Sequence, residues 1–223
     1  MLSLTYRSEM GFASVGFIVA VVSQKGGVGK STIARALATE AGKGGLSVKV
    51  VDMDTQQGTF MDWYQKRLDL GRADVCSVEY AGSVEKALGF VQQYDLLVID
   101  APARSSKATL ELAKSADVVI QPTGTGRDDV RPAVLLFYEL EKEKVPKERL
   151  FFVLSRVGTQ AEEEEAREYL EETGFSVLPG SLVEKATYRQ SQSEGLSITE
   201  TRYKTLNEKA KEITNFIFGL LEK

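Results

Sequence analysis

The feature that most constrains the fold of this chain is an apolar run that leads through a glycine-rich loop into a helical pattern. The apolar run covers residues 17–22, and the loop reads SQKGGVGKST from Ser23 to Thr32. The helical pattern follows at once, with Ile33, Leu37 and Ala41 spaced to share one face. A strand that enters a helix through such a loop is the context that phosphate binding requires. The segment therefore predicts an α/β fold with a phosphate loop at residues 23–32.

The remainder of the chain continues the alternation of strand-like and helical patterns. Helical patterns lie at 32–41, 84–91 and 206–221, and a dense acidic run at 162–165 is typical of a helix start. The arrangement predicts a doubly wound, mostly parallel sheet with helices on both faces. We expect residues 17–223 to form a single domain and 1–16 to be a loosely structured extension. The strand-like runs lie at 17–22, 47–51, 75–80, 96–99, 118–121, 150–154 and 175–178.

Composition excludes several kinds of chemistry. The 223 residues include no histidine, which removes Ser-His-Asp triads and histidine zinc sites, and one cysteine, Cys76, which removes intramolecular disulfides. The longest apolar run is too short to cross a bilayer. With 43% hydrophobic and 27% charged residues, the chain reads as a folded cytoplasmic protein. Catalysis must rest on carboxylates, lysines, arginines and a bound ion.

The phosphate loop contains the groups that bind a nucleotide triphosphate with Mg²⁺. Glycines allow the loop backbone to wrap its N–H groups around phosphate oxygens. Lys30 is placed to reach the β- and γ-phosphates, Ser31 to coordinate Mg²⁺, and Thr32 to hold the loop. The expected nucleotide contacts are Lys25, Gly26, Gly27, Val28, Gly29, Lys30, Ser31 and Thr32.

Three aspartates follow predicted strands. Asp52 and Asp54 come after the second strand, and Asp100 ends the run at 96–99. Acidic residues at the carboxyl ends of parallel strands face the ligand crevice, so a metal site is one reading. Helix capping is the other, because a helical pattern begins near Thr59.

The loop and these aspartates resemble the ParA/MinD family of ATPases, whose loop reads K-G-G-x-G-K-[ST] and carries a second lysine, here Lys25. The resemblance implies a P-loop ATPase that uses ATP and Mg²⁺ and forms a homodimer in the ATP state. Lys25 would then act on the partner's nucleotide, with Lys25, Lys30 and Asp54 as catalytic residues. Asp54 would orient the attacking water, and Ser31, Asp52 and Asp100 would form the metal site. Thr55 stands where the family commonly has proline.

The resemblance also suggests binding residues later in the chain. Pro122 and Thr123, in the segment 122–125, match a region that lies near the nucleotide base in relatives, although an ordinary loop fits equally well. The short ParF-type relatives carry basic residues that face nonspecific DNA. A solvated helix face is an equally good reading of the matching residues here, which are Lys185, Arg189, Arg202 and Lys204.

The expected function is that of a ParA-like ATPase associated with the nucleoid. It would bind DNA nonspecifically, hydrolyse ATP slowly without a partner, and segregate DNA or another large cargo with a ParB-like or other adaptor. The alternatives are a MinD-like site-selection ATPase that uses the last helix at a membrane, a metabolic enzyme that uses ATP, and an inert filament subunit. Packing of the last helix on its own domain is the favoured reading, so a membrane partner is not expected.

Overall fold

Seven strands form one parallel sheet, as the alternating pattern predicts. The computed structural model describes residues 16–54, 59–103 and 106–222, so residues 1–15 of the expected extension lie outside it. All strand pairings are parallel. The strand order is β3-β2-β4-β1-β5-β6-β7. The strands are β1 (Phe17–Val21), β2 (Val48–Asp52), β3 (Ser77–Tyr80), β4 (Leu96–Asp100), β5 (Val118–Thr123), β6 (Leu150–Val157) and β7 (Ser176–Val183).

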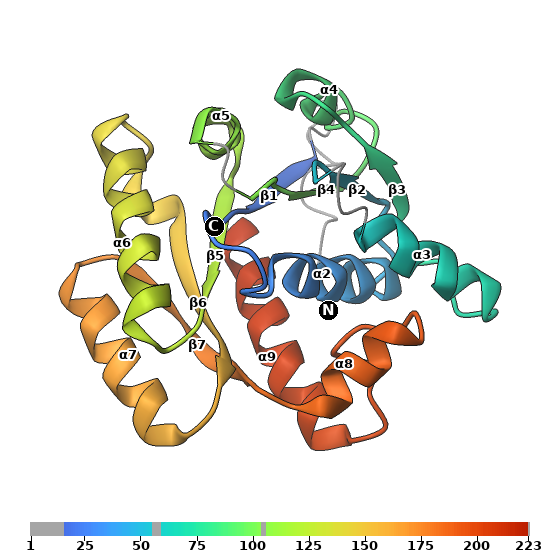
Figure 1. Cartoon of the computed structure of the whole chain (residues 1–223). Coiled ribbons are helices and arrows are strands. Elements are labelled where there is room, and N and C mark those ends of the chain that lie inside the picture. Colours follow the sequence, from blue (N-terminus) through green and yellow to red (C-terminus); the bar gives the residue numbers. More distant parts are fainter. Residues whose placement is uncertain (1–15, 55–58, 104–105, 223) are drawn as a thin grey trace.

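Helices cover both faces of this sheet, which confirms the doubly wound arrangement (Figure 1). A short 3-10 helix, η1 (Lys147–Arg149), leads into β6. One face carries α2 (Lys30–Lys43), α3 (Thr59–Asp69), α8 (Ala186–Ser193) and α9 (Lys204–Leu221). The other carries α4 (Val84–Leu88), α5 (Ser106–Ser115), α6 (Arg127–Lys142) and α7 (Gln160–Glu172).

The two faces of the sheet hold separate apolar cores because side chains alternate along each strand. On β1, Val19 and Val21 belong to the core under α2 and α9, whereas Ile18 and Ala20 belong to the opposite core. Central strands such as β4 are buried throughout. This double burial explains why the strands read as continuous apolar runs.

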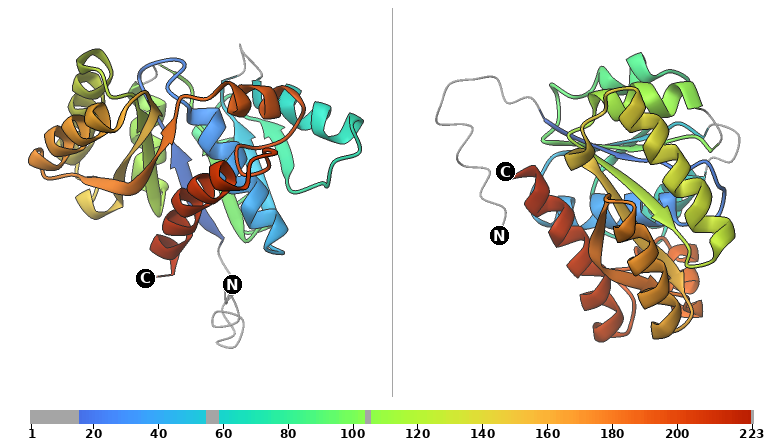
Figure 2. Two further views of the ribbon diagram at one scale, coloured as in Figure 1. Left: turned by 90° about the horizontal axis from the view of Figure 1, so that it is seen from below. Right: turned by 90° about the vertical axis from the view of Figure 1, so that its left-hand side faces the viewer.

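The last helix packs on its own domain, as expected from its mixed polar face. Its apolar positions Ala210, Ile213 and Ile217 are at most 1% exposed, and α9 lies beside α2 in both views of Figure 2. Among the residues that the structure describes, no helix is long and apolar enough to span a membrane. The acidic run also begins a helix, since Thr159 and Glu162 form a capping box at the start of α7.

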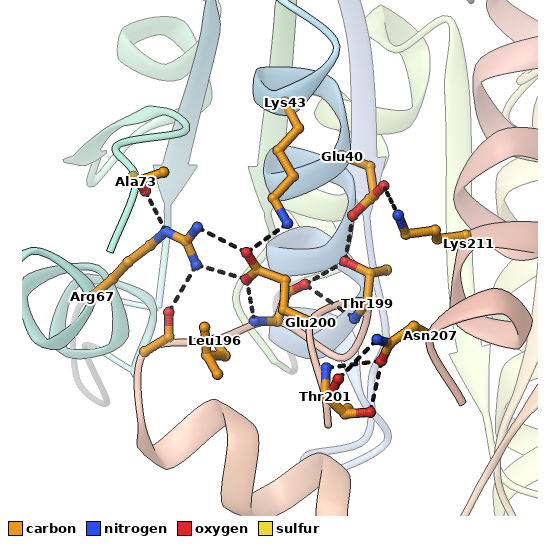
Figure 3. A network of polar contacts seen from close by, with 12 residues as sticks. Glu40, Lys43, Arg67, Ala73, Leu196, Thr199, Glu200, Thr201, Asn207 and Lys211 are labelled. Atoms are coloured by element: carbon orange, nitrogen blue, oxygen red, sulfur yellow. Dashed lines mark hydrogen bonds and ion pairs between the residues drawn. The ribbon is translucent and has the colours of Figure 1, made fainter. Parts of the chain in front are cut away.

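A polar network fixes the C-terminal ends of α2 and α3 against the segment that joins α8 to α9 (Figure 3). Arg67 of α3 is 1% exposed and binds both carboxylate oxygens of Glu200, at 2.7 and 3.0 Å. Lys43 of α2 pairs with the same carboxylate at 2.7 Å. Burial would raise the pKa of Glu200, but the hydrogen bonds from Arg67 and Lys43 lower it to about 2. The α8–α9 connection is therefore anchored to the two helices that follow β1 and β2.

Strand register brings the candidate site residues to one edge of the sheet. Asp52 pairs in register with Asp100, and Asp100 pairs with Val21, the last residue of β1. Strand β1 lies between β4 and β5. Strands β2, β3 and β4 lie on one side of it and β5, β6 and β7 on the other, so the strand order reverses at β1. Ligands of open α/β sheets bind at such a switch point, beyond the carboxyl ends of the strands.

Candidate phosphate-binding site

The loop between β1 and α2 has the backbone conformation that its glycines allow. Gly27 and Gly29 have φ angles of 76° and 104°, in the left-handed region that side chains disfavour. Gly29 caps α2, and its carbonyl accepts the first helical hydrogen bond from Ile33 N at 3.0 Å. The loop start is fixed by Ser23, whose Oγ accepts from Lys25 N at 3.0 Å. The positive end of the α2 dipole thus faces the hollow beside the loop.

The end of β6 supports the loop, a role that the sequence analysis missed. Ser155 is 2% exposed, and its Oγ donates to Val28 O. Arg156 has a φ of 57° and donates from Nη1 to Gly27 O at 3.4 Å. These bonds tie two carbonyl groups of the loop to the end of β6. Their place at the carboxyl end of a parallel strand was the one signal available in the sequence.

The expected phosphate-binding residues surround a hollow of about 190 Å³, here called the phosphate hollow. Lys30 lines this hollow and is only 9% exposed. Val28, which also belongs to the loop, is buried and does not line the hollow. Lys25 does not line this hollow. Its lining residues are Gly26, Gly27, Gly29, Lys30, Ser31, Thr32, Asp54, Asp100 and Ala103.

Asp100 has the properties of a carboxylate that helps to hold a cation. It is 2% exposed, and its Oδ1 has no hydrogen-bond partner within the described part of the chain. Burial raises its pKa to about 6, although a hydrogen bond with the Ser31 side chain and the charge of Lys30 lower it. Residues 16–54, 59–103 and 106–222 contain no cluster of three or more acidic, histidine or cysteine ligands. A buried carboxylate with one unbonded oxygen beside a serine hydroxyl suits Mg²⁺, which usually keeps several waters and takes one or two protein oxygens.

Asp52 is held by backbone donors that follow β2. Its Oδ1 accepts from Asp54 N at 2.9 Å, and its Oδ2 accepts from Phe60 N at 3.2 Å, at the start of α3. Asp52 is fully buried and lines no part of the phosphate hollow, whereas Asp54 does. Burial raises the pKa of Asp52, and these two backbone bonds lower it. Each oxygen of Asp52 thus accepts from one backbone donor, which agrees with the capping interpretation, and the expected metal role of Asp52 stays a prediction. Thr55 lies outside the described residues.

Lys25 turns away from the phosphate hollow toward α6. Its ammonium group pairs with Asp129 and also donates to the main-chain oxygen of Asp128 at 3.3 Å. The Lys25 side chain is 46% exposed. The two lysines of the loop thus lie in different surroundings, one beside the phosphates' expected position and one at the surface.

A second hollow of about 280 Å³, here called the side hollow, shares Gly27, Gly29 and Thr32 with the phosphate hollow. Pro122 and Thr123 line neither hollow, since both are buried inside β5. The base contact expected at these positions stays a prediction. The side hollow is lined by Gly27, Gly29, Thr32, Ser155, Arg156, Leu182, Val183, Glu184, Lys185, Tyr188, Arg189 and Gln192.

The four basic residues expected to face DNA lie in two different places. Lys185 and Arg189 line the side hollow, where Arg189 pairs with Glu184. Arg202 instead stacks over the Tyr203 ring at 4.9 Å, and Lys204 lies 3.8 Å from Glu208 at the start of α9. Only Arg202 and Lys204 are away from both hollows.

Comparisons with known proteins agree with this geometry. Maintenance of carboxysome distribution protein A of Gloeobacter kilaueensis is 28% identical over 198 residues, which cover 86% of this chain and 88% of that protein. The fold is similar to MinD in the Aquifex aeolicus MinC:MinD complex, with a TM-score of 0.74, 16% identity, and coverage of 92% and 96%. It is also similar to a Cyanothece McdA–ATP complex, with a TM-score of 0.72, 16% identity, and coverage of 92% and 97%.

A third solved structure is a putative plasmid partition protein from Borrelia burgdorferi B31 bound to AMPPNP. Its TM-score is 0.68 at 21% identity, and the match covers 93% of this chain and 100% of that one. The model of the CobQ/CobB/MinD/ParA nucleotide binding domain matches residues 19–198, from β1 to the α8–α9 connection. Since this match spans most of the chain and includes the loop, Asp54 and Asp100, the chain belongs to the CobQ/CobB/MinD/ParA nucleotide-binding domain family.

Proposed function

We propose that the protein is a ParA-type ATPase that dimerises on ATP and positions DNA or another large cargo. The observation that carries this proposal is the divergence of the two loop lysines. Lys30 lines its own phosphate hollow, whereas Lys25 lies outside it and reaches the first turn of α6. A lysine held beside the site, 46% exposed, is available to a nucleotide in a second copy of the chain.

The two hollows offer a seat for a whole nucleotide. The phosphates would occupy the phosphate hollow, and the base and ribose would occupy the side hollow, because Gly27, Gly29 and Thr32 line both. This proposal replaces Pro122 and Thr123 as base contacts with the end of β6 and the residues of α8. The relatives named above include complexes with ATP and AMPPNP, which supports ATP as the nucleotide.

The chemistry follows from the groups around the phosphate hollow. Ser31 and Asp100 would hold Mg²⁺, which neutralises phosphate charge when it is bound. Asp54 would orient the attacking water, and Lys30 would stabilise the β- and γ-phosphates. Lys25 of the second copy would neutralise charge that develops on the transferring group, as arginine fingers do. We expect slow hydrolysis by the protein alone, because completion of this site depends on a second copy and an adaptor.

The DNA-binding face of this ATPase would centre on Arg202 and Lys204 at the start of α9. The relative from Gloeobacter is named for carboxysome distribution, and the one from Borrelia for plasmid partition, which supports cargo positioning as the task. A cytoplasmic protein that associates with the nucleoid and recognises its cargo through an adaptor fits these names. The cargo itself would be specified by that adaptor.

The mass in solution tests the proposal. Light scattering would compare the native chain and Lys25→Ala with ADP and with a nonhydrolysable ATP analogue. We expect a dimer for the native chain with the analogue alone, and a monomer for Lys25→Ala in both states. A mass that ignores nucleotide in both proteins would contradict the proposal and favour an enzyme that uses ATP on a small substrate.

A further inference from the structure

Tyr188 lies between the side hollow and the start of α9. Its side chain belongs to α8, lines the side hollow and is only 6% exposed. Its hydroxyl group donates to Leu206 O at 3.0 Å, in the first turn of α9. The ring therefore connects a wall of the proposed nucleotide seat to the helix that begins at Lys204. A tyrosine side chain is rigid and has only two torsions, so a shift of one end of it moves the other.

The first turn of α9 has little local support of its own. Within the described part of the chain, Tyr203 at the N-cap makes no capping hydrogen bond with its side chain, and the first turn contains no acidic residue. Lys204 occupies the first helical position, where a positive charge opposes the positive end of the helix dipole. The turn therefore depends on contacts with other parts of the chain. One is Tyr188, and another is Asn207, whose side chain makes hydrogen bonds of 2.6–2.8 Å with Thr201 (Figure 3).

The C-terminal half of α8 is fixed by other helices. Gln192 Oε1 accepts from Thr32 Oγ1 at 3.3 Å and from Arg35 Nη1 at 3.0 Å, both on α2. Just after α8, Leu196 O accepts from Trp63 Nε1 of α3 at 3.1 Å. Gln192 thus connects the side hollow to α2, whereas the hydroxyl of Tyr188 leaves the same hollow in the direction of α9.

We propose that Tyr188 is a positioning residue through which a nucleotide base in the side hollow stabilises the first turn of α9. A base that fills the hollow packs against the tyrosine ring and restricts its motion, because closely packed groups cannot move independently. The restricted ring keeps its hydroxyl beside Leu206 O, so the first turn opens less often. Arg202 and Lys204, in the proposed DNA-binding face, lie between Thr201 and Leu206 and are ordered with them. The inference rests on the nucleotide seat of the proposed function.

Hydrogen–deuterium exchange read by mass spectrometry tests this coupling in the ADP state, in which we expect a single chain. Saturating ADP with Mg²⁺ should slow exchange at residues 204–210 of the native protein by about threefold or more, as the net gain of a hydrogen bond would. In Tyr188→Phe, which keeps the ring and removes the hydroxyl, the slowing should be less than about 1.5-fold. Peptides from the loop at residues 23–32 should be protected by ADP in both proteins.

Inorganic pyrophosphate separates the effect of the base from that of the phosphates. Because it has no base, it should protect the loop and leave exchange at residues 204–210 unchanged. Equal slowing of α9 by pyrophosphate and by ADP would overturn a connection through the side hollow.

Two matched variants separate the coupling from general loosening. Tyr169→Phe removes a hydroxyl from an exposed side chain of α7, on the other face of the sheet, and should behave as the native protein does. Asn207→Ala removes the hydrogen bonds to Thr201. It should speed exchange in α9 with and without ADP, while the slowing by ADP persists.

The outcomes distinguish the inference from the proposal on which it rests. Full slowing of α9 by ADP in Tyr188→Phe would overturn the role of the hydroxyl. In the native protein, a protected loop with unchanged exchange in α9 would overturn the whole inference, and this comparison holds even if Tyr188→Phe fails to fold. Failure of ADP to protect the loop of the native protein would instead contradict the proposed nucleotide seat.

Discussion

The ammonium group of Lys25 is held in its own chain by the carboxylate of Asp129, on the first turn of α6. A lysine that serves a second copy must leave this partner first. In the proposed dimer, the pair would therefore oppose association by the amount that it stabilises the single chain. With side chains 46% and 24% exposed, the pair contributes about 0.2–1 kcal/mol.

We predict that Asp129→Asn strengthens the dimer formed with a nonhydrolysable ATP analogue. The dimer dissociation constant should fall by up to about fivefold, because the competing ion pair is lost. Sedimentation velocity over a concentration series measures it. Asp128→Asn is the matched control, since only the main-chain oxygen of Asp128 contacts Lys25. A weaker dimer in Asp129→Asn would mean that this carboxylate also serves the assembled state.

Loss of the buried Glu200 carboxylate should destabilise the fold without affecting nucleotide chemistry. In Glu200→Gln the buried Arg67 loses its charged partner, and removal of one member of such a pair costs about 3–5 kcal/mol. Urea unfolding monitored by circular dichroism gives the change. A loss below about 1 kcal/mol would show that water or Ala73 O and Gly195 O compensate the guanidinium.

The same carboxylate predicts that the free energy of unfolding decreases in acid. The pKa of Glu200 is lowered in the folded chain from 4.5 to about 2, so its contribution is present above the unfolded value. It should be lost progressively as pH falls from about 5 to about 2. The unfolding free energy of native protein should therefore fall more steeply across this range than that of Glu200→Gln. Parallel curves would contradict the lowered pKa.

We predict that the charge of Asp100 lowers the free energy of unfolding and is required for metal binding. Its pKa is raised to about 6, so the folded chain holds a strained buried charge at pH 7.5, and stability contributed by its protonated form is lost as pH rises through 6. Asp100→Asn removes that charge and should raise the unfolding free energy by about 1 kcal/mol or more without metal. Mn²⁺ binding with ADP should be abolished. Thermal unfolding in EDTA and Mn²⁺ titration check the two parts. A less stable Asp100→Asn with intact metal binding would contradict both.

Ser155 should matter for the loop although it lies far from it in sequence. In Ser155→Ala the buried Val28 carbonyl loses its donor, which should cost about 1–3 kcal/mol of stability and weaken ADP binding. Urea unfolding and calorimetry with ADP measure these effects. Ser115→Ala, on the exposed end of α5, is the control. Unchanged ADP affinity would show that Gly27 and Gly29 fix the loop without help from β6.

The four basic candidates should divide into two groups in DNA binding. Loss of Arg202 and Lys204 together should reduce the slope of log affinity against log salt by about 1.8, since each phosphate contact contributes about 0.9. Arg189→Ala should instead change ADP affinity, because Arg189 lines the side hollow. Fluorescence anisotropy with random duplex DNA and the ATP analogue tests this. An unchanged slope in the double variant would place any DNA contact elsewhere.

Local patterns were sufficient to predict the sheet and the loop. Each of the seven apolar runs became a strand, and boundaries differed by a few residues at most, as β6 and β7 extend further than their apolar runs. The glycine pattern at 26–29 also fixed the loop conformation, because only glycine adopts the φ angles at Gly27 and Gly29 without strain. Lys30, Asp54 and Asp100 could be placed together from the sequence because each follows the end of a strand, and all three line the phosphate hollow.

Roles that depend on distant partners could not be predicted in this way. Asp52 and Asp100 look alike in sequence, yet the first binds the backbone at the start of α3 and the second faces the phosphate hollow. Ser155, Arg156 and Gln192 approach the loop through sheet order and helix packing rather than through sequence distance. Pro122 matches a nucleotide contact by its position in the sequence, and the structure places it among the buried residues of β5.

The sequence by itself determined the sheet, the phosphate loop and the residues at the strand ends, because these follow from the alternation of side chains and the steric freedom of glycine. Only the tertiary structure decided which polar groups meet. It turned Lys25 toward Asp129, stacked Arg35 between α3 and α8, and placed Lys185 and Arg189 in the side hollow. The physical reason is that hydrogen bonds and ion pairs depend on distances of a few ångströms between elements, which sequence spacing does not encode.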